Sequence, residues 1–287
     1  MIIVICFDCM NEYKNETMNA KKPVSFTIIF ENDDFAVLNK KQGIPTAPLK
    51  IDDFSVLTEF LSTREMTEHI TGKKAVEAGL LHRLDTATSG IILIAKRQKI
   101  YDALQHMQEL DLIEKEYTAI CDFLPQTILK PCFPKADSLH LPYSFDISSY
   151  FVPFGKGAKK VKAIFDLTSY LSKKKHKTQL KKPYITHITI SNYEKGDIIC
   201  TCRLTQGYRH QVRCHLSSIG MPIKGDGLYN VAYIEEHKER ITKEVQDHSY
   251  PLELKACKIS FPSPYLPLSS RTERLSFSLP IQDRKNL

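Results

Sequence analysis

The side chains best placed for chemistry surround Asp85, in residues 81–96, which read LHRLDTATSGIILIAK. Asp85 follows Arg83 by two residues and precedes Gly90 by five. The apolar segment 91–95 comes next, and a short apolar run of this kind is typical of a buried strand. Glycine permits a tight bend of the backbone before such a strand. The pattern predicts a carboxylate held on a loop at the mouth of a rigid strand.

A purely structural role would explain the same residues. An aspartate followed by threonines and a serine most often closes a loop or caps a helix, because its carboxylate accepts hydrogen bonds from nearby amides. Asp85 alone therefore does not establish a reactive site, and the rest of the chain has to decide between the two interpretations.

Two further segments carry candidate side chains. Residues 115–120, KEYTAI, alternate like a strand that contains Tyr117, although an isolated strand tyrosine is ordinarily a half-buried packing residue. Residues 210–219 have the spacing of a helix with Val212, Leu216 and Ile219 on its packed side, which would fix the direction of Arg213. A surface arginine is the plain alternative for that position.

These segments together resemble one family. HRLDTATSG is similar to the HRLDxxTSG signature of the RluA-type pseudouridine synthases, and three more segments follow in that family's order. Residues 26–48 resemble its opening motif, through Lys40, Gln42 and Gly43, and residues 115–119 resemble its KxYxA segment. Residues 206–229 resemble its TGRTHQIRVH…GxPIxGDxxY block, and the matching residues are Gly207, His210, Gln211, Arg213, His215, Gly220, Pro222, Ile223, Gly225, Asp226 and Tyr229.

The resemblance implies a reaction and a set of roles. Pseudouridine formation breaks the bond from ribose carbon 1′ to the base nitrogen, turns the base and rejoins it through carbon 5. By resemblance Asp85 is the catalytic carboxylate, Arg213 is its ionic partner, and Tyr117 lies against the target base. Whether the aspartate attacks the sugar, attacks the base or acts as a base at carbon 2′ stays open. The reaction needs no redox cofactor, metal or ATP, so we expect none.

The target uridine must leave its stack to react, which costs a few kcal/mol. The resemblance suggests that Arg83 assists by filling the vacated space or gripping a phosphate, while His82 supports the loop and is more typical of a structural residue. The residues implied in RNA binding are Arg83, His82, Arg209, His210 and Gln211.

The sequence departs from the family pattern at four positions. Lys41 stands where the opening motif usually has proline, which should loosen that loop. Gln206, Tyr208 and Arg209 replace the usual threonine, arginine and threonine or serine. Arg209 is then an imperfect substitute for the arginine missing at position 208, which concerns substrate contact more than catalysis.

Composition sets broader limits. The 287 residues suffice for one large domain or two ordinary ones, and 42% hydrophobic with 25% charged residues is a normal globular balance. No apolar run approaches the ~20 residues of a membrane span, and the first residues are unlike a secretory signal. The eight cysteines complete no zinc-ligand set, so we expect incidental thiols and no metal. These features predict a soluble, cytoplasmic protein. We expect a monomer, although no sequence feature defines the oligomeric state.

Positive charge is concentrated in one segment. Between Lys156 and Lys182 there are ten lysines and one acid, Asp166, which gives this segment a charge of +9. The whole chain carries +7, so the remaining residues sum to −2. Such a patch is expected for a polyanion-binding surface, because each phosphate contact releases counterions. A solvated lysine-rich loop is the alternative when the charge run is considered alone.

The domain prediction separates an N-terminal extension, residues 1–24, for which disorder is one interpretation, from a catalytic domain over residues 25–284. One hypothesis places the natural start at Met18. By resemblance we expect an α+β fold, a mainly antiparallel mixed sheet flanked by helices with the site in a cleft. Periodicity predicts strands at 25–30, 163–170, 185–192, 197–204, 252–261 and 275–279, helices at 53–64 and 99–110, and loop from 121 to 153.

Three functions fit these observations. The first is an isomerase that makes pseudouridine in ribosomal or transfer RNA. The second is an RNA-binding protein that has kept the fold and lost the activity, although Asp85, Tyr117 and Arg213 are all present. The third is a hydrolase that uses Asp85, but no second carboxylate stands in the neighbouring motifs, as glycoside cleavage ordinarily requires.

Overall fold

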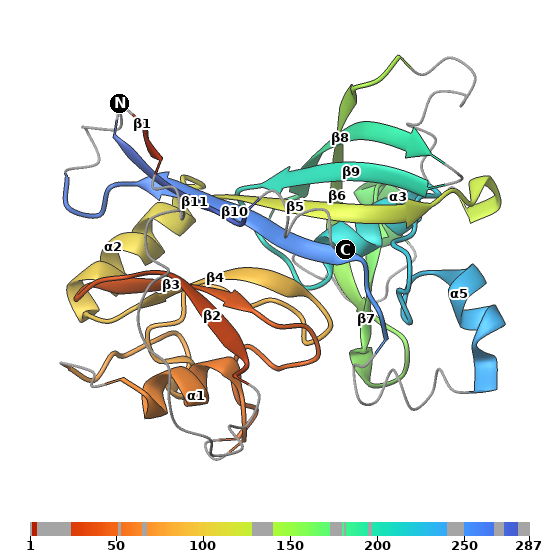
Figure 1. Ribbon diagram of the computed structural model, residues 1–287. Helices are drawn as coiled ribbons and strands as arrows, with labels where there is room; N and C mark the ends of the chain where they lie inside the picture. The colour runs from red at the N-terminus through yellow and green to blue at the C-terminus, as the bar shows by residue number, and fades with distance from the viewer. Residues whose placement is uncertain are drawn as a thin grey trace. The chain divides into compact units, whose positions relative to one another are not determined.

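The computed structural model divides the chain into two compact units (Figure 1). Unit 1 combines residues 1–115 with 256–286, and unit 2 spans residues 116–255. The residues that the structure describes are 2–4, 24–50, 53–64, 68–127, 140–172, 180, 182–194, 197–239, 250–266 and 273–280. Most of the predicted extension, residues 5–23, therefore lies outside the described residues.

Unit 1 is built on a sheet with the strand order β2-β3-β4-β10. The strands are β2 (Phe26–Glu31), β3 (Phe35–Lys40), β4 (Ser89–Ala95) and β10 (Leu254–Pro262). Strands β2, β3 and β4 pair antiparallel, with Leu38 opposite Ile92. Strand β11 (Arg274–Ser278) pairs antiparallel with β10, and β1 (Ile2–Val4) runs parallel to β11. The apolar run of β4 is buried along its length, as a central strand requires.

The helices of unit 1 confirm the periodicity-based predictions. Helix α1 (Val56–Ser62) starts at Ser55, whose side chain accepts from the Thr58 amide while Thr58 reciprocates in a capping box. Helix α2 (Gln98–Glu109) buries Ile100, Leu104 and Met107. A short 3-10 helix, η1 (Ala75–Glu77), lies between them in the chain.

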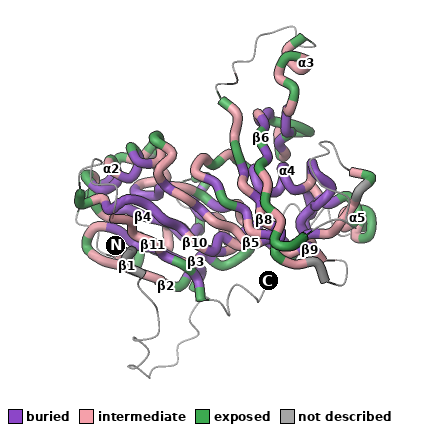
Figure 2. The backbone as a smooth tube through the Cα atoms, turned by 90° about the horizontal axis from the view of Figure 1, so that it is seen from above, coloured by how far each residue is buried: buried purple, intermediate pink, exposed green. Residues whose placement is uncertain are grey.

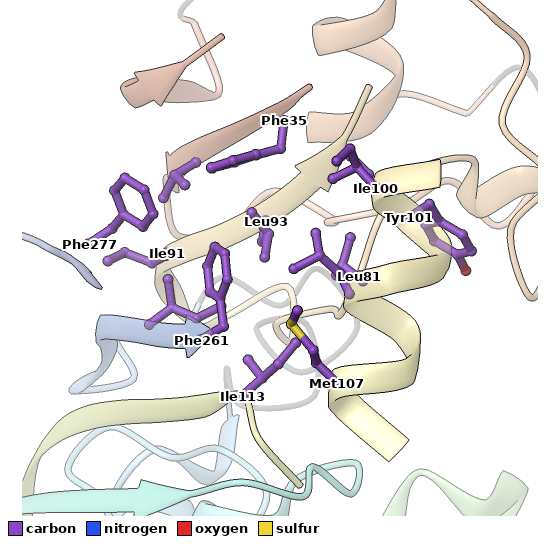
Figure 3. Close-up of a cluster of buried hydrophobic side chains, with 14 of the residues drawn as sticks. Phe35, Leu81, Ile91, Leu93, Ile100, Tyr101, Met107, Ile113, Phe261 and Phe277 are labelled. Atoms are coloured by element: carbon purple, nitrogen blue, oxygen red, sulfur yellow. The ribbon is translucent and has the colours of Figure 1, made fainter. Parts of the chain in front are cut away.

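The core of unit 1 forms between its sheet and α2. Figure 3 shows Phe35, Leu93 and Phe261 from the strands beside Ile100 and Met107 from the helix. Phe261 and Phe277 make edge or tilted contacts with Phe35 and with each other, at centroid distances of 5.9 to 6.0 Å. This core anchors β4, the strand that directly follows the Asp85 loop.

In unit 2 the strand order is β5-β9-β8-β6-β7. Its strands are β5 (Glu114–Asp122), β6 (Tyr143–Phe154), β7 (Lys160–Ile164), β8 (Tyr184–Glu194) and β9 (Asp197–Leu204). Its helices are α3 (Leu167–Ser172), α4 (Gln211–Ser218) and α5 (Val231–Glu236), with the 3-10 turns η2 (Pro125–Thr127) and η4 (Lys156–Ala158). The predicted β8–β9 hairpin and the predicted helix at 210–219 are confirmed.

Two predicted segments were wrong. Residues 143–153 were expected to be loop but form most of β6. The strand was missed because the polar Ser149 lies on its buried face and interrupts the apolar alternation. The strand expected at 163–170 ends at Ile164, and α3 follows. The Asp166 carboxylate accepts from the Ser169 amide, a helix-capping contact that ends the strand. Figure 2 shows α3 without buried residues.

Among the described residues, no helix is long and apolar enough to span a membrane. The described part of the chain also contains no cluster of histidine, cysteine or acidic residues suited to a metal ion. Its five cysteines, Cys121, Cys200, Cys202, Cys214 and Cys257, are buried free thiols, whereas Cys6, Cys9 and Cys132 lie outside the described residues.

Candidate active site

The Asp85 loop is fixed by the loop that follows β3. The Thr46 hydroxyl donates to the Leu84 carbonyl at 2.8 Å and accepts from the Leu84 amide at 3.2 Å. The Gly43 amide donates to the Thr86 carbonyl at 2.9 Å. Gly43 has φ +80°, a backbone conformation that favours glycine. The residues on both sides of Asp85 are thus tied to unit 1, and Asp85 itself is half-buried.

Lys40 completes this clamp from inside the protein. Its side chain is fully buried, and its ammonium donates to the carbonyls of Ile44 at 2.7 Å, Lys41 at 2.9 Å and Thr86 at 3.1 Å. Burial lowers the pKa of Lys40 to about 7, and the Asp85 carboxylate acts in the opposite direction. Lys40 therefore joins the loop after β3 to the Asp85 loop and places a titratable positive charge close to the candidate catalytic group.

Gly90 sets the start of β4. It pairs with Lys40 across the β3–β4 ladder, which brings the lysine beside the Asp85 loop. Its φ is +115°, and a Cβ at this position would lie 2.2 Å from the Ala256 carbonyl oxygen. A larger residue would push β10 away, so the glycine of the TATSG sequence is required by packing as well as by backbone conformation.

The two residues before Leu84 have different environments. The Arg83 side chain is half exposed and forms an ion pair with Glu77 at 3.1 Å. His82 is half-buried, and its Nε2 atom is buried without a hydrogen-bond partner among the described residues. Burial, followed by the nearby Lys115 ammonium, lowers the pKa of His82 well below its usual value. Of the two side chains Arg83 is the more exposed, and the predicted RNA contacts of both residues stay predictions.

Arg213 occupies the core of unit 2 and is not a surface arginine. The side chain is 1% exposed. Its Nε donates to Asp226 Oδ2 at 2.9 Å, and one terminal nitrogen donates to Asp226 Oδ1 at 2.7 Å and to the Tyr250 hydroxyl at 2.8 Å. This forked pairing holds the planar guanidinium in one orientation. Asp85 belongs to the other unit, and its predicted pairing with Arg213 stays a prediction.

The residues around Arg213 bond to protein groups. Gln211 is buried, and its amide contacts the Tyr208 amide, the Ile185 carbonyl and the Thr186 hydroxyl. His210 has φ +55°, and its Nδ1 lies 3.0 Å from the Tyr229 hydroxyl. These described contacts give both residues positioning roles, while their predicted RNA contacts stay untested.

The remaining predicted residues lie on strand or loop surfaces of unit 2. Tyr117 is half-buried in β5, as an alternating strand predicts. Arg209 is exposed, but one guanidinium nitrogen donates to the carbonyls of Ala158 and Lys160, the latter at 3.1 Å. Tyr208 replaces the usual arginine with an aromatic contact, since its ring stacks on Phe151 at 5.1 Å and 13°. The substitution at position 208 therefore serves packing.

Sequence reasoning assigned no role to several residues that build these clusters. Lys40 and Asp226 were matched as motif residues only, and Thr46 and Tyr250 carried no signal at all. The acceptors of Lys40 are backbone carbonyls, and Tyr250 lies 37 residues from its partner Arg213. Contacts of these kinds leave no local sequence pattern.

Mainly antiparallel β-structure with flanking helices places this protein in the α+β fold class. Two solved human structures titled RNA Pseudouridylate Synthase Domain Containing 4 and Domain Containing 1 share the fold. Their TM-scores are 0.54 and 0.56, their identities 17% and 16%, and the matches cover 88% and 92% of this chain and 87% and 86% of theirs. The predicted α+β pseudouridine synthase fold is confirmed.

A family model described as RNA pseudouridylate synthase matches residues 34–218, which is more than half of the chain, and the chain belongs to that family. The resemblance to RluA-type synthases is confirmed. "Ribosomal large subunit pseudouridine synthase D" of Zymomonas mobilis is 26% identical over 78% of this chain and 62% of its own length. "tRNA pseudouridine(32) synthase, mitochondrial" of Saccharomyces cerevisiae is 26% identical over 76% of this chain and 39% of its own length.

A third relative is "Uncharacterized RNA pseudouridine synthase YlyB" of Bacillus subtilis, which is 24% identical over 72% of this chain. The match covers 59% of that relative. The chain thus matches less than two thirds of the length of each of these three curated relatives.

Proposed function

We propose that this protein isomerises specific uridines in ribosomal or transfer RNA to pseudouridine, with Asp85 as the reacting carboxylate. The supporting observation is the clamp on the Asp85 loop, in which Lys40, Gly43 and Thr46 hold the backbone on both sides of the aspartate. A group held in this way keeps its position through a reaction. The two RNA classes follow the names of two relatives, one a ribosomal large subunit pseudouridine synthase and the other a tRNA pseudouridine(32) synthase.

The isomerisation consists of three chemical changes in the uridine. The bond between carbon 1′ and the base nitrogen breaks, a bond between carbon 1′ and carbon 5 forms, and the proton on carbon 5 is lost while the freed nitrogen gains one. In our proposal Asp85 reacts, Tyr117 retains the detached uracil, and Arg213 serves as the cation of the reacting set. Arg83 is half exposed near Asp85, and in our proposal it contacts the RNA at the place from which the uridine flips out.

The experiment is pseudouridine mapping of ribosomal and transfer RNA in a strain that lacks the gene. We expect modified positions to be lost in the deletion strain, restored by the wild-type gene and not restored by Asp85→Asn. The matched control is Asp102→Asn, which removes an exposed carboxylate on α2 in the same unit and should restore every position. Restoration by Asp85→Asn would exclude this aspartate as the reacting group.

The second candidate is an RNA-binding protein with the same fold and no activity. It predicts no lost position in the deletion strain although purified protein still binds RNA. A hydrolase predicts free uracil in place of pseudouridine, which chromatography of the reaction products distinguishes. We also propose a monomer in the cytoplasm, to be tested by gel filtration and cell fractionation.

A further inference from the structure

The β6–β7 hairpin presents two chemically different faces. Strands β6 and β7 are antiparallel neighbours, with Phe154 opposite Lys160 and Val152 opposite Lys162. Residues that face each other across such a ladder share a side, so these four lie on one face. The other face carries Phe151, Val161 and Ala163, which pack with Cys214 of α4 in one buried cluster. The hairpin is therefore packed through this face. On the opposite face Val152 is buried, whereas Phe154, at the end nearest the turn, is exposed.

That outer end combines an aromatic ring with cations. The Phe154 side chain is 54% exposed, and the ammonium of Lys162 lies 5.9 Å from its ring centroid. Lys156 and Lys159, in the turn, are also exposed, as is Lys162. None of these three lysines forms an ion pair with a described acidic side chain. One lysine ammonium already lies beside the exposed ring, and two more exposed lysines stand in the adjoining turn, so this end of the hairpin offers an aromatic surface and positive charge together.

The hairpin is held firmly although it lies at the edge of the sheet. The Val161 amide donates to the Tyr229 hydroxyl at 2.8 Å, and the Cys214 thiol lies 3.5 Å from the Val161 carbonyl oxygen. Arg209 donates to the carbonyl of Ala158, in the turn, and to that of Lys160, where β7 begins. The Arg209 guanidinium thus positions the exposed residues instead of leaving them on a loose loop.

A flat ring flanked by cations suits single-stranded nucleic acid. Bases stack on aromatic rings whatever their sequence, and lysines beside the ring meet the phosphates. A polyanion without bases, such as an acidic peptide, would use the lysines and leave the ring idle. We propose that the β6–β7 hairpin binds a single-stranded RNA segment, with one base stacked on Phe154 and the backbone phosphates on Lys156, Lys159 and Lys162. The proposal rests on the proposed function for its RNA, and it assigns a contact surface that the reacting residues do not include.

The stacking part is tested with full-length protein and two fluorescein-labelled probes of roughly ten nucleotides, an oligouridylate and an abasic strand of the same length. Fluorescence anisotropy should show that Phe154→Ala weakens oligouridylate binding about 10-fold and leaves binding of the abasic strand unchanged. The matched control is Phe54→Ala, which removes an equally exposed ring of unit 1 (55% exposed) and should change neither affinity. Equal binding of the oligouridylate by Phe154→Ala and wild type would overturn the stacking contact.

The phosphate part is tested by substituting Lys156, Lys159 and Lys162 with alanine together. Affinity for both probes should fall, and the dependence of log affinity on log salt should become shallower by about 2, at ~0.7 for each single-strand phosphate contact. The control replaces three other exposed lysines, Lys50, Lys99 and Lys238. An equal change of slope in the control would overturn a specific hairpin surface, because any three charges would then suffice.

Asp85→Asn separates this proposal from the proposed function. That variant should bind the oligouridylate like wild type while it makes no pseudouridine. If wild type also makes none, the proposed function fails, and the contrast between Phe154→Ala and Phe54→Ala still decides the hairpin contact. If Asp85→Asn and wild type differ in activity but Phe154→Ala binds normally, only the hairpin proposal fails.

Discussion

At the scale of single residues, the site depends on a buried lysine. An ammonium has three N–H donors, and Lys40 directs its donors at three carbonyls from two loops. Burying a charged ammonium costs free energy, and the same cost lowers the pKa of Lys40 to about 7. The gain is positional, because the lysine ties the Thr86 carbonyl, next to Asp85, to the end of β3.

Lys40→Met tests this role. Methionine keeps most of the side-chain volume but leaves the three carbonyls without their donor. We expect the free energy of unfolding in urea to fall by about 2 kcal/mol. We also expect pseudouridine formation in single-turnover assays to fall at least about 10-fold, since misplacement of a reacting group by about 1 Å has effects of this size.

The neighbouring Lys41 supplies the control for this prediction. Lys41 is exposed, so Lys41→Met should change neither stability nor turnover. If the two variants behave alike, Lys40 does not hold the Asp85 loop.

The residue scale also shows what a sequence can reveal. Asp85, Tyr117 and Arg213 were found because each stands inside a recognisable motif. Asp226, whose carboxylate orients Arg213 within unit 2, matched the family motif but was given no role. Tyr250, the second partner of Arg213, lies in no motif. Their roles come from contacts between distant parts of the chain, which spacing in the sequence does not encode.

At the scale of elements, α4 is unusual because it buries polar side chains on most sides. Gln211, Arg213, His215 and Ser218 are all buried. His215 joins the helix to the sheet, with Nε2 at 2.8 Å from the Ser149 hydroxyl of β6 and Nδ1 at 2.9 Å from the Thr186 hydroxyl of β8. The Thr186 hydroxyl also accepts from the side-chain amide of Gln211, so two residues of α4 meet β8 at one hydroxyl.

His215 makes the stability of the protein depend on pH. Burial lowers its pKa from 6.5 to about 3. Between these values the unfolded chain binds a proton that the folded protein excludes, so stability is lost as the pH falls. The contribution of His215 should fall by about 1.4 kcal/mol per pH unit below pH 6.5.

Urea unfolding at a series of pH values measures this contribution. His215→Asn should be less stable at neutral pH, and its stability should fall less steeply than that of wild type between pH ~6.5 and ~5. His82 is unchanged in both proteins and adds the same slope to each. The control is His69→Asn at an exposed position, which should keep the wild-type slope. An unaltered slope in His215→Asn would show that folding does not lower the pKa of this histidine.

The elements also show where local patterns suffice. Helix α1 was predictable because Ser55 and the spacing of Val56, Leu57 and Phe60 lie within a few residues. Strand β6 was not predictable as a strand, because Ser149 occupies its buried face to meet His215 of a distant helix. The strand predicted at 163–170 ran past the end of β7. Apolar and polar residues alternate there, but Asp166 caps the helix that follows.

At the scale of the whole molecule, charge is the dominant feature. The segment from Lys156 to Lys182 carries +9, in a chain whose other residues sum to −2. Four of its lysines lie on the described hairpin, at 156, 159, 160 and 162, and Lys173, Lys174, Lys175, Lys177 and Lys181 lie outside the described residues. A concentrated charge of this kind directs a polyanion toward one surface during its approach.

Stopped-flow measurements should detect this guidance. Replacing Lys156, Lys159 and Lys162 with glutamate should reduce the association rate constant for the oligouridylate about 10-fold at low salt and flatten its salt dependence. Glutamates at Lys50, Lys99 and Lys238 change the net charge equally and should have a smaller effect. Identical rates for the two variants would mean that total charge, and not its placement, controls the approach of RNA.

Unit 1 takes its strands from both ends of the described sequence, and this has a consequence during synthesis. Strand β4 lies beside β10, and Gly90 is shaped to the backbone of Ala256. Roughly 160 residues separate these strands, which a ribosome translating ~5 to 20 residues per second adds in about 10 to 30 s. During that interval one edge of the apolar strand β4 has no neighbour. The nascent chain is then open to aggregation, and the cell must shield it until the last strands emerge.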